Sequence, residues 1–239
     1  YQVYGMSEEE ASSLSGGSTH QTDVASAGKD EGSAEDQYEG DPGREVASLL
    51  SYALGCIFGR WDIRTASSLI NLEGFDPFAP LAPGARGALT NDRGLSVSRD
   101  EVPEDYPITI QWDGILPDDE GHPSDVVGKI RTVLAHLFPD WDSIEREACQ
   151  VLNVRRLRAY LSSRFFPFHI KQYSKSHRKA PIYWLLQSSR KSYGLWLYYP
   201  LLNRDTLYVA LRNYVEPKLA HEQEVLGKLK TQYAQAREE

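Results

Sequence analysis

The chain has 239 residues, of which 41% are hydrophobic and 25% charged, as in an ordinary soluble globular protein. No apolar run approaches the roughly 18–20 residues of a membrane-spanning helix, and no secretory leader opens the sequence, so no membrane partner is expected. Two cysteines, Cys56 and Cys149, indicate no disulfide framework and fit a reducing, cytoplasmic location. The sequence starts at Tyr1, and we expect it to be part of a longer chain.

The formal net charge of −8 is distributed unevenly. Residues 1–45 hold eleven acids against two bases, and residues 46–153 hold seventeen acids against eight bases. Residues 154–214, in contrast, hold twelve Lys and Arg against Asp205 alone, a local net charge of +11. A basic segment in an acidic protein usually has an anionic partner, most commonly nucleic acid. The alternative is that acidic segments of the same chain neutralise it.

The first half of the chain alternates between linker-like and helical sequence. Residues 1–44 are rich in Glu, Ser, Gly and Asp, which predicts an acidic disordered linker. Residues 45–61 are apolar on nearly every side and predict a buried helix, in which Gly55 and Gly59 would let another helix approach closely. Residues 71–107 form a Pro/Gly-rich loop in which only short turns are expected.

A short alternating stretch, residues 108–112, predicts a strand that leads into an acidic turn. The turn contains Asp113, Asp118, Asp119, Glu120 and His122. Its spacing does not match the EF-hand pattern, and no second histidine or carboxylate lies at a helical offset. We therefore expect a solvated turn and no metal site.

Three amphipathic helices are predicted next. The first is capped by Ser124 and ends at Phe138, the second covers residues 142–152, and the third covers residues 153–163. In the third helix the leucines and the tyrosine face inward, which leaves its three arginines to extend the basic segment.

Two aromatic-rich apolar runs, residues 181–187 and 193–199, are separated by a short polar turn and predict a β-hairpin. A further helix is predicted from Asp205 to Val215, and Pro217 either kinks or restarts it.

These elements predict an α+β fold that is mainly α. It comprises a helical domain over residues 45–219 with one aromatic-rich antiparallel β-hairpin, followed by a C-terminal helix over residues 220–239.

The sequence contains no motif of a self-contained active site. It has no Gly-rich phosphate loop, CxxC pair, HExxH or Gly-x-Ser-x-Gly sequence. His169 and His177 flank the basic segment and are expected to be exposed polar residues. We therefore expect no catalytic residue, no metal and no cofactor in this chain.

Five strings carry a resemblance to a known family. In order, they are LSYALGCIFGRWDIR (50–64), IQWDGILPDD (110–119), IEREACQVL (144–152), LRAYLSSRFFPFHIKQYSKSHRKAPIYWLLQS (157–188) and YGLWLYYPLLNRDTLYVALRNYVEPKL (193–219). They resemble the post-catalytic region of large adenine-specific DNA methyltransferases. That family includes the PglX methyltransferases of BREX phage-defence systems and related single-chain restriction-modification enzymes.

The resemblance implies a parent enzyme that transfers a methyl group from S-adenosylmethionine to adenine. Such an enzyme holds a flipped adenine with an Asn/Asp-Pro-Pro-Tyr motif. Asp76-Pro77-Phe78 and Ala79-Pro80 do not replace that motif, because the acceptor for the adenine amine and the stacking tyrosine are missing. The resemblance thus implies a non-catalytic accessory domain between the methyltransferase and target-recognition domains of the parent chain.

Double-stranded DNA is the expected partner of the basic segment, whose cations would contact phosphates while a tyrosine stacks on or supports them. The candidate residues are Arg155, Arg156, Arg158, Lys171, Tyr173, Lys175, Arg178, Lys179, Arg190 and Lys191. The alternative is a purely structural module that braces the parent enzyme and binds no DNA itself.

Overall fold

The structure is a computed structural model that describes residues 41–67, 84–175 and 178–238. Most of the acidic linker and the first part of the Pro/Gly-rich loop lie outside these ranges. The helical segments are α2 (Pro42–Ile57), α3 (Ile63–Ala66), the 3-10 turn η2 (Arg99–Glu101), α4 (Val126–Leu137), α5 (Trp141–Val151), α6 (Leu157–Tyr160), the π-helical turn η3 (Leu161–Phe165), α7 (Phe166–Gln172), the 3-10 turn η4 (Tyr199–Leu201), α8 (Thr206–Ala210), the π-helical turn η5 (Leu211–Val215) and α9 (Glu216–Glu238). The strands are β1 (Ile115–Pro117), β2 (Ser174–Lys175), β3 (Arg178–Lys179), β4 (Tyr183–Gln187) and β5 (Gly194–Tyr198).

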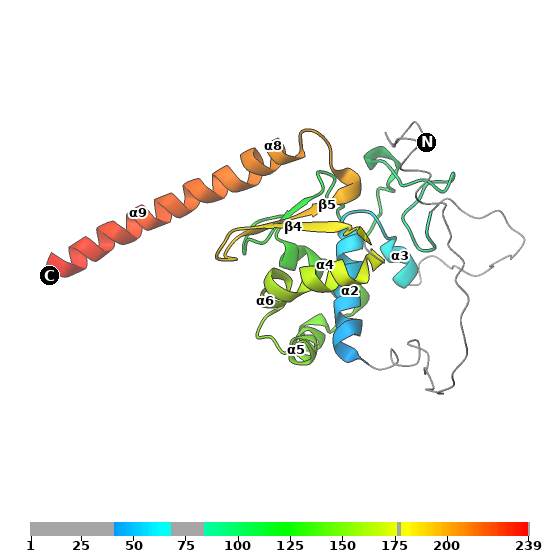
Figure 1. The fold of residues 1–239 in the computed structure, drawn as a ribbon, viewed down its shortest axis with the longest axis horizontal. Coiled ribbons are helices and arrows are strands. Elements are labelled where there is room, and N and C mark those ends of the chain that lie inside the picture. Colours follow the sequence, from blue (N-terminus) through cyan, green and yellow to red (C-terminus); the bar gives the residue numbers. More distant parts are fainter. Residues whose placement is uncertain (1–40, 68–83, 176–177, 239) are drawn as a thin grey trace, which may run out of the picture. The chain divides into compact units, whose positions relative to one another are not determined.

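Helix α2 is the helix predicted over residues 45–61, and it packs against α4 and α5 (Figure 1). It begins at Pro42 because the carboxylate of Asp41 caps it, accepting hydrogen bonds from the backbone N–H groups of Gly43 at 3.0 Å and Arg44 at 3.3 Å. The chain leaves the helix at Gly59, whose φ of +70° suits glycine. Six apolar side chains of α2 are almost fully buried: Ala47, Leu50, Ala53, Leu54, Cys56 and Ile57.

The acidic turn and the helix after it are connected through Asp125. The predicted cap at Ser124 is wrong, because Asp125 is the N-cap of α4 and its carboxylate accepts from Gly128 N at 2.9 Å. A second oxygen of Asp125 accepts from Asp119 N at 3.0 Å. A carboxylate can satisfy donors on both sides of the helix start, which a serine hydroxyl does less well.

The predicted hairpin is confirmed as β4 and β5, which pair antiparallel from Tyr183↔Tyr198 to Gln187↔Gly194. The strand expected at residues 108–112 is wrong. The backbone there is tied instead to the end of α2, because Gln111 N donates to Ile57 O at 2.8 Å. The strand, β1, begins after Gly114, inside the stretch predicted as an acidic turn, and adds to β5, giving the order β1-β5-β4.

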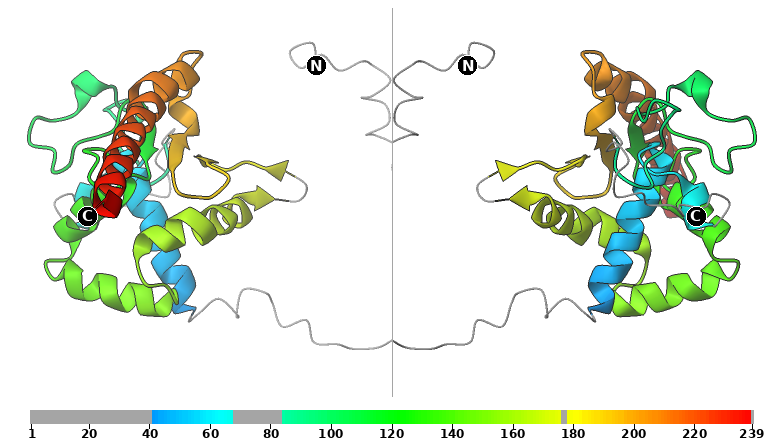
Figure 2. Two further views of the ribbon diagram at one scale, coloured as in Figure 1. Left: turned by 90° about the vertical axis from the view of Figure 1, so that its left-hand side faces the viewer. Right: turned by 90° about the vertical axis from the view of Figure 1, so that its right-hand side faces the viewer.

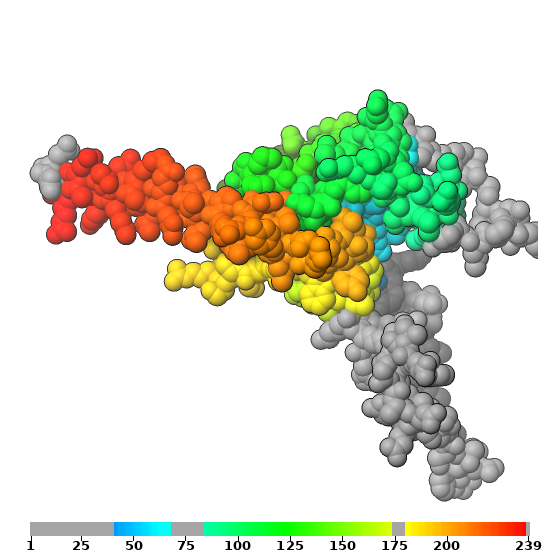
Figure 3. Space-filling model, turned by 90° about the horizontal axis from the view of Figure 1, so that it is seen from above, coloured from blue at the N-terminus to red at the C-terminus, as the bar shows by residue number. Residues whose placement is uncertain are grey.

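Strand β5 is buried on both faces, so most of the hairpin aromatics belong to the core. Trp196 and Tyr198 point into the larger cluster with α2 and α4, whereas Leu195 and Leu197 belong to a smaller cluster with Ala210 of α8. Figure 3 shows the orange α8 segment lying between the green β1 region and the yellow hairpin. The helix therefore covers the second face of the sheet.

Two long helices continue through a proline by means of a π-helical turn. Pro167 is the second residue of α7 and follows η3, and Pro217 is the second residue of α9 and follows η5. A proline lacks the N–H of an α-helical bond, and its ring clashes with the carbonyl four residues earlier. The wider turn removes this conflict, so the helix at Pro217 continues without ending.

The helix predicted over residues 153–163 is wrong at both ends. Asn153 has a φ of +50° and ends α5, and the Arg164 guanidinium donates to the carbonyls of Leu152 at 2.6 Å and Asn153 at 2.9 Å. The next helix starts at Leu157 and runs through η3 to Gln172. In the described ranges, no helix is long and apolar enough to cross a membrane.

The remaining predictions for the C-terminal half agree with the structure. Asp205 occupies the N-cap position of α8, although its side chain makes no capping bond. Helix α9 is long, as expected, and its side chains from Leu219 onward are exposed in the described residues. The fold is α+β and mainly α.

Candidate nucleic-acid interface

Strand β4 runs antiparallel to the helix formed by α6, η3 and α7. At the end of β4, Gln187 Nε2 donates to Ser162 O at 2.9 Å. Just before its start, Ile182 N donates to His169 Nε2 at 3.0 Å. The predicted basic residues therefore separate into two groups, one at each end of this helix. Arg155, Arg156, Arg158, Arg190 and Lys191 belong to the first end, and Lys171, Tyr173, Lys175, Arg178 and Lys179 to the second.

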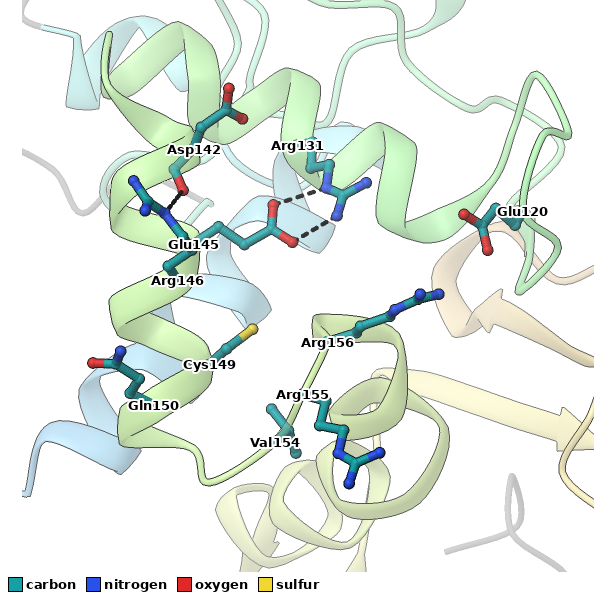
Figure 4. A pocket seen from close by; sticks show the side chains of 10 residues that line it. All are labelled: Glu120, Arg131, Asp142, Glu145, Arg146, Cys149, Gln150, Val154, Arg155 and Arg156. Carbon is teal, nitrogen blue, oxygen red and sulfur yellow. Dashed lines mark hydrogen bonds and ion pairs between the residues drawn. The ribbon is translucent and has the colours of Figure 1, made fainter.

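Arg155 and Arg156 are exposed and line a hollow of about 570 Å³ between α5 and the start of α6 (Figure 4). Arg131 and Glu145 lie in the same hollow, where the guanidinium makes two bonds of 2.8 and 2.7 Å to the carboxylate. Within the described residues, neither Arg155 nor Arg156 has an ion-pair partner. They supply positive charge that is not paired, in a hollow that Glu120, Asp142 and Glu145 also line.

Arg158 is held within the protein. Its guanidinium donates to Asp118 and, through two bonds of 2.9 Å, to both oxygens of Asp125. The exposed fractions of the side chains are 26% for Arg158, 6% for Asp118 and 8% for Asp125. Burial raises the pKa of Asp118 above its ordinary value, although Arg158 opposes this. Burial alone lowers the pKa of Arg158, but the bonds to Asp125 and Asp118 outweigh it and raise this pKa.

The acidic turn has partners from distant parts of the chain. Lys218 Nζ of α9 lies 2.8 Å from Asp119 Oδ1, and the Tyr214 hydroxyl donates to Asp113. Arg158 therefore shows that part of the basic segment is neutralised internally, and Lys218, just beyond that segment, adds a further ion pair to the same turn. A solvated turn was expected here, whereas the structure places a network of ion pairs and hydrogen bonds.

At the second end of the helix, Lys171 is exposed and Tyr173 is half-buried. The Tyr173 hydroxyl accepts a hydrogen bond from Arg60 Nη1 at 3.0 Å, and its ring centroid lies 4.7 Å from that of His169. Tyr173 therefore supports the interior of the protein. Arg60 had no predicted binding role, and its contact with a residue 113 positions away could not be found from local sequence.

The basic run after Tyr173 forms a small antiparallel ladder. Ser174 pairs with Lys179, and Lys175 pairs with Arg178. Figure 2 shows β2 and β3 continuing from the end of α7. The ladder was not predicted from sequence.

Arg190 and Lys191 are exposed on the turn between β4 and β5. Lys191 has a φ of +56°, and the turn is closed by Ser188, whose hydroxyl accepts from Ser192 N at 3.1 Å and Tyr193 N at 3.2 Å. These two cations also lack an ion-pair partner among the residues that the structure describes.

The expectation that His169 is exposed is wrong. Its side chain is completely buried, and Nε2 accepts from Ile182 N and from Tyr183 N at 3.0 and 3.1 Å. Burial and, secondly, the charge of Arg60 lower the pKa of His169 to about 4. His169 is therefore a neutral core residue that holds the start of β4 against α7, while His177 lies outside the described residues.

Sequence comparison relates the chain to adenine-specific methyltransferases of the BREX type, which confirms the resemblance seen in the five strings. One such relative is the adenine-specific methyltransferase BrxX of Escherichia coli O9:H4 (strain HS). It is 31% identical over 208 residues, an alignment that covers 80% of this chain. The same alignment spans only 15% of the length of the relative. No protein-family model matches the chain.

Proposed function

We propose that this chain is a non-catalytic segment of a DNA methyltransferase that modifies adenine, and that it holds the DNA backbone near the methyltransferase and target-recognition domains. The observation that carries the proposal is that Arg155 and Arg156, which are exposed and line the 570 Å³ hollow, make no ion pair with the described residues. Guanidinium groups without a carboxylate partner are available to phosphate oxygens. Such contacts give affinity with little sequence information.

The proposal assigns no methyl-transfer step to this chain. Its sequence lacks the Asn/Asp-Pro-Pro-Tyr motif, so S-adenosylmethionine and the flipped adenine would be bound elsewhere in the parent enzyme. The parent would act in restriction-modification or phage defence. We place its action in the cytoplasm, where the free thiols of Cys56 and Cys149 stay reduced.

A salt titration of duplex binding tests the proposal. We expect log K to fall linearly with log salt, with a slope of about −0.9 for each phosphate contacted. The double variant Arg155→Ala/Arg156→Ala should reduce the magnitude of this slope by about 1–2 and weaken binding equally for all sequences. No binding by the wild type near 50 mM salt, or a slope close to zero, would contradict a role in backbone contact.

A purely structural bracing module remains the second candidate. The contacts that favour it are the pairing of Arg158 with Asp118 and of Lys218 with Asp119, which join segments far apart in the chain. Charge reversal by Arg155→Glu/Arg156→Glu separates the two functions. Lost duplex affinity at an unchanged melting temperature supports backbone contact, whereas duplex binding that is unchanged in this variant supports bracing by the ion pairs of Arg158 and Lys218.

A further inference from the structure

The side chain of Arg60, just after α2, lies half-buried among aromatic rings. Its guanidinium carbon is 4.5 Å from the centroid of the Trp61 ring and 5.5 Å from that of Tyr173. The chain is held in this position because Gly59 turns it with a positive φ and Arg60 N donates to Gly55 O at 2.7 Å. The guanidinium is thus fixed by both its backbone and its ring contacts.

Arg60 differs from the other partly buried arginines in lacking a carboxylate. Arg64 pairs with Asp62, and Arg158 pairs with two aspartates. Within the described ranges no carboxylate oxygen lies within 4.0 Å of the Arg60 guanidinium, whose hydrogen-bond acceptor there is the neutral Tyr173 hydroxyl. Burying a charge without a counter-charge is costly, so an anion from outside would be stabilised here.

A pocket of about 280 Å³ is lined by Arg60 and by Trp61, the residue whose ring the Arg60 guanidinium covers. Its lining includes Arg60, Trp61, Thr90, Ser96 and Tyr198. Two backbone links hold the loop across from Arg60: the Trp61↔Ala88 bridge, and the 3.3 Å bond from Leu89 N to Arg60 O. The Thr90↔Ser96 bridge closes the loop itself, so the two hydroxyl residues lie side by side in the lining.

The groups in the pocket select for a small anion. Among the described residues that line it are one arginine and the hydroxyl residues Thr90 and Ser96, and none of these lining residues is Asp or Glu. Stacking of a base is disfavoured, because Arg60 covers the Trp61 ring and the Tyr198 ring stacks on Phe58 with centroids 5.1 Å apart. The volume also lies just below the roughly 300–1,000 Å³ of pockets for drug-sized ligands.

We propose that this pocket binds a phosphate group, with the Arg60 guanidinium as the charged donor and the Thr90 and Ser96 hydroxyls as further donors. A planar guanidinium matches two phosphate oxygens at once, which an ammonium group does not. Arg60 lines the pocket and donates to Tyr173, which follows α7, so the pocket lies near the second end of the helix formed by α6, η3 and α7. The phosphate is either a free one or part of a DNA backbone, and the backbone source rests on the function proposed above.

Thermal unfolding of the full chain in inorganic phosphate, against chloride at equal ionic strength, tests the site. A ligand that binds the folded state raises the melting temperature in a saturable manner. Phosphate also stabilises proteins without binding, so the comparison between variants is decisive. We expect Arg60→Gln, and separately Thr90→Val/Ser96→Ala, to weaken phosphate binding by at least about tenfold.

Arg64→Gln is the matched control, because Arg64 also lies over an aromatic ring, that of Tyr106 at 5.4 Å, but is paired with Asp62. It should keep the phosphate response of the wild type. If Arg60→Gln does not fold, the Thr90→Val/Ser96→Ala variant decides. A phosphate response that is equal in the wild type and in the hydroxyl variant overturns the proposal.

The source of the phosphate is determined by duplex binding of the Thr90→Val/Ser96→Ala variant. A salt slope reduced in magnitude by about 1 identifies a backbone phosphate, and an unchanged slope together with weakened phosphate binding identifies a free phosphate. Failure of the wild type to bind duplex contradicts the function proposed above but leaves the phosphate titration informative.

Discussion

At the scale of single residues, three arginines within four positions have different environments. Arg155 and Arg156 are exposed at the rim of a polar hollow, whereas Arg158 contacts two buried aspartates. The difference arises because Asp125 caps α4 with its carboxylate at the place where α6 begins. Arg158 is therefore part of the packing of the fold, and we leave it out of the proposed DNA contact.

Replacing Arg158 by Met should lower the free energy of unfolding by about 3 kcal/mol, because Asp118 and Asp125 then remain buried without a cation. Urea unfolding measures the effect. The matched control Arg155→Met should change stability by no more than about 0.5 kcal/mol. Adding Asp118→Asn to Arg158→Met should recover part of the loss, and no recovery would contradict uncompensated charge as the cause.

His169 predicts a pH dependence of stability. Its pKa is about 4 in the folded protein, against about 6.5 in an unfolded chain, so the unfolded state binds more protons between these values. Stability should therefore fall as the pH is lowered from 6.5 to 4, by up to about 2–3 kcal/mol from this residue. His169→Gln keeps an acceptor for the two backbone N–H groups but cannot titrate. The free energy of unfolding of this variant should depend less steeply on pH in this interval than that of the wild type. The same pH dependence in both proteins would argue against His169 as the group that titrates.

At the scale of elements, the indole of Trp61 packs against Gly55 of α2, the helix that Trp61 follows. A Cβ atom at Gly55 would lie 2.1 Å from Trp61 Cδ1 and 3.1 Å from the Tyr183 hydroxyl. The sequence predicts that Gly55 lets another helix approach closely, but the group packed against Gly55 is the indole of Trp61, which follows the same helix. Because the Arg60 guanidinium lies over the Trp61 ring, this packing also positions the proposed phosphate pocket.

Gly55→Ala should lower the free energy of unfolding by about 1–3 kcal/mol through overpacking. The control is Gly227→Ala in α9, where nothing lies within 4 Å of the added Cβ. There alanine should increase helix stability by up to about 1 kcal/mol. Chemical unfolding and far-UV circular dichroism measure the two effects, and equal destabilisation by both variants would contradict this account.

At the scale of the whole molecule, two of the predicted DNA-contacting cations that make no ion pair with described residues, Arg156 and Lys171, lie at opposite ends of one helix. Arg156 and Lys171 are fifteen residues apart, which is about 23 Å at 1.5 Å per residue. A DNA duplex covers this distance in about seven base pairs at 3.4 Å each. A single duplex could thus contact both ends.

Duplex length should therefore decide whether Lys171 contributes. Lys171→Ala is expected to reduce the magnitude of the salt slope by about 1 for duplexes well above seven base pairs and to have little effect on shorter ones. Arg155→Ala serves as the reference at the opposite end. If the two variants depend on duplex length in the same way, the ends do not share one duplex.

Some predictions that rest on local pattern succeeded, although the helix predicted over residues 153–163 is wrong at both ends. Apolar periodicity located α2 and α5, and alternating aromatic residues around a polar turn located β4 and β5. Other predictions failed: the strand at 108–112, the cap at Ser124 and the exposure of His169. At 108–112 and at His169 the observed arrangement depends on a hydrogen bond to another segment, such as the bond from Gln111 N to Ile57 O, whereas the cap of α4 depends on the local bonds of Asp125.

By itself, the sequence determined the fold class, the hairpin and the relation to adenine-specific methyltransferases, because helix periodicity, turn chemistry and similarity are all present along the chain. Only the tertiary structure decided which cations are free. Arg158 meets Asp118 and Asp125 across 40 and 33 positions, and Arg60 meets Tyr173 across 113. Charge compensation depends on distance in space, so a local net charge of +11 could not separate structural arginines from those available to a phosphate.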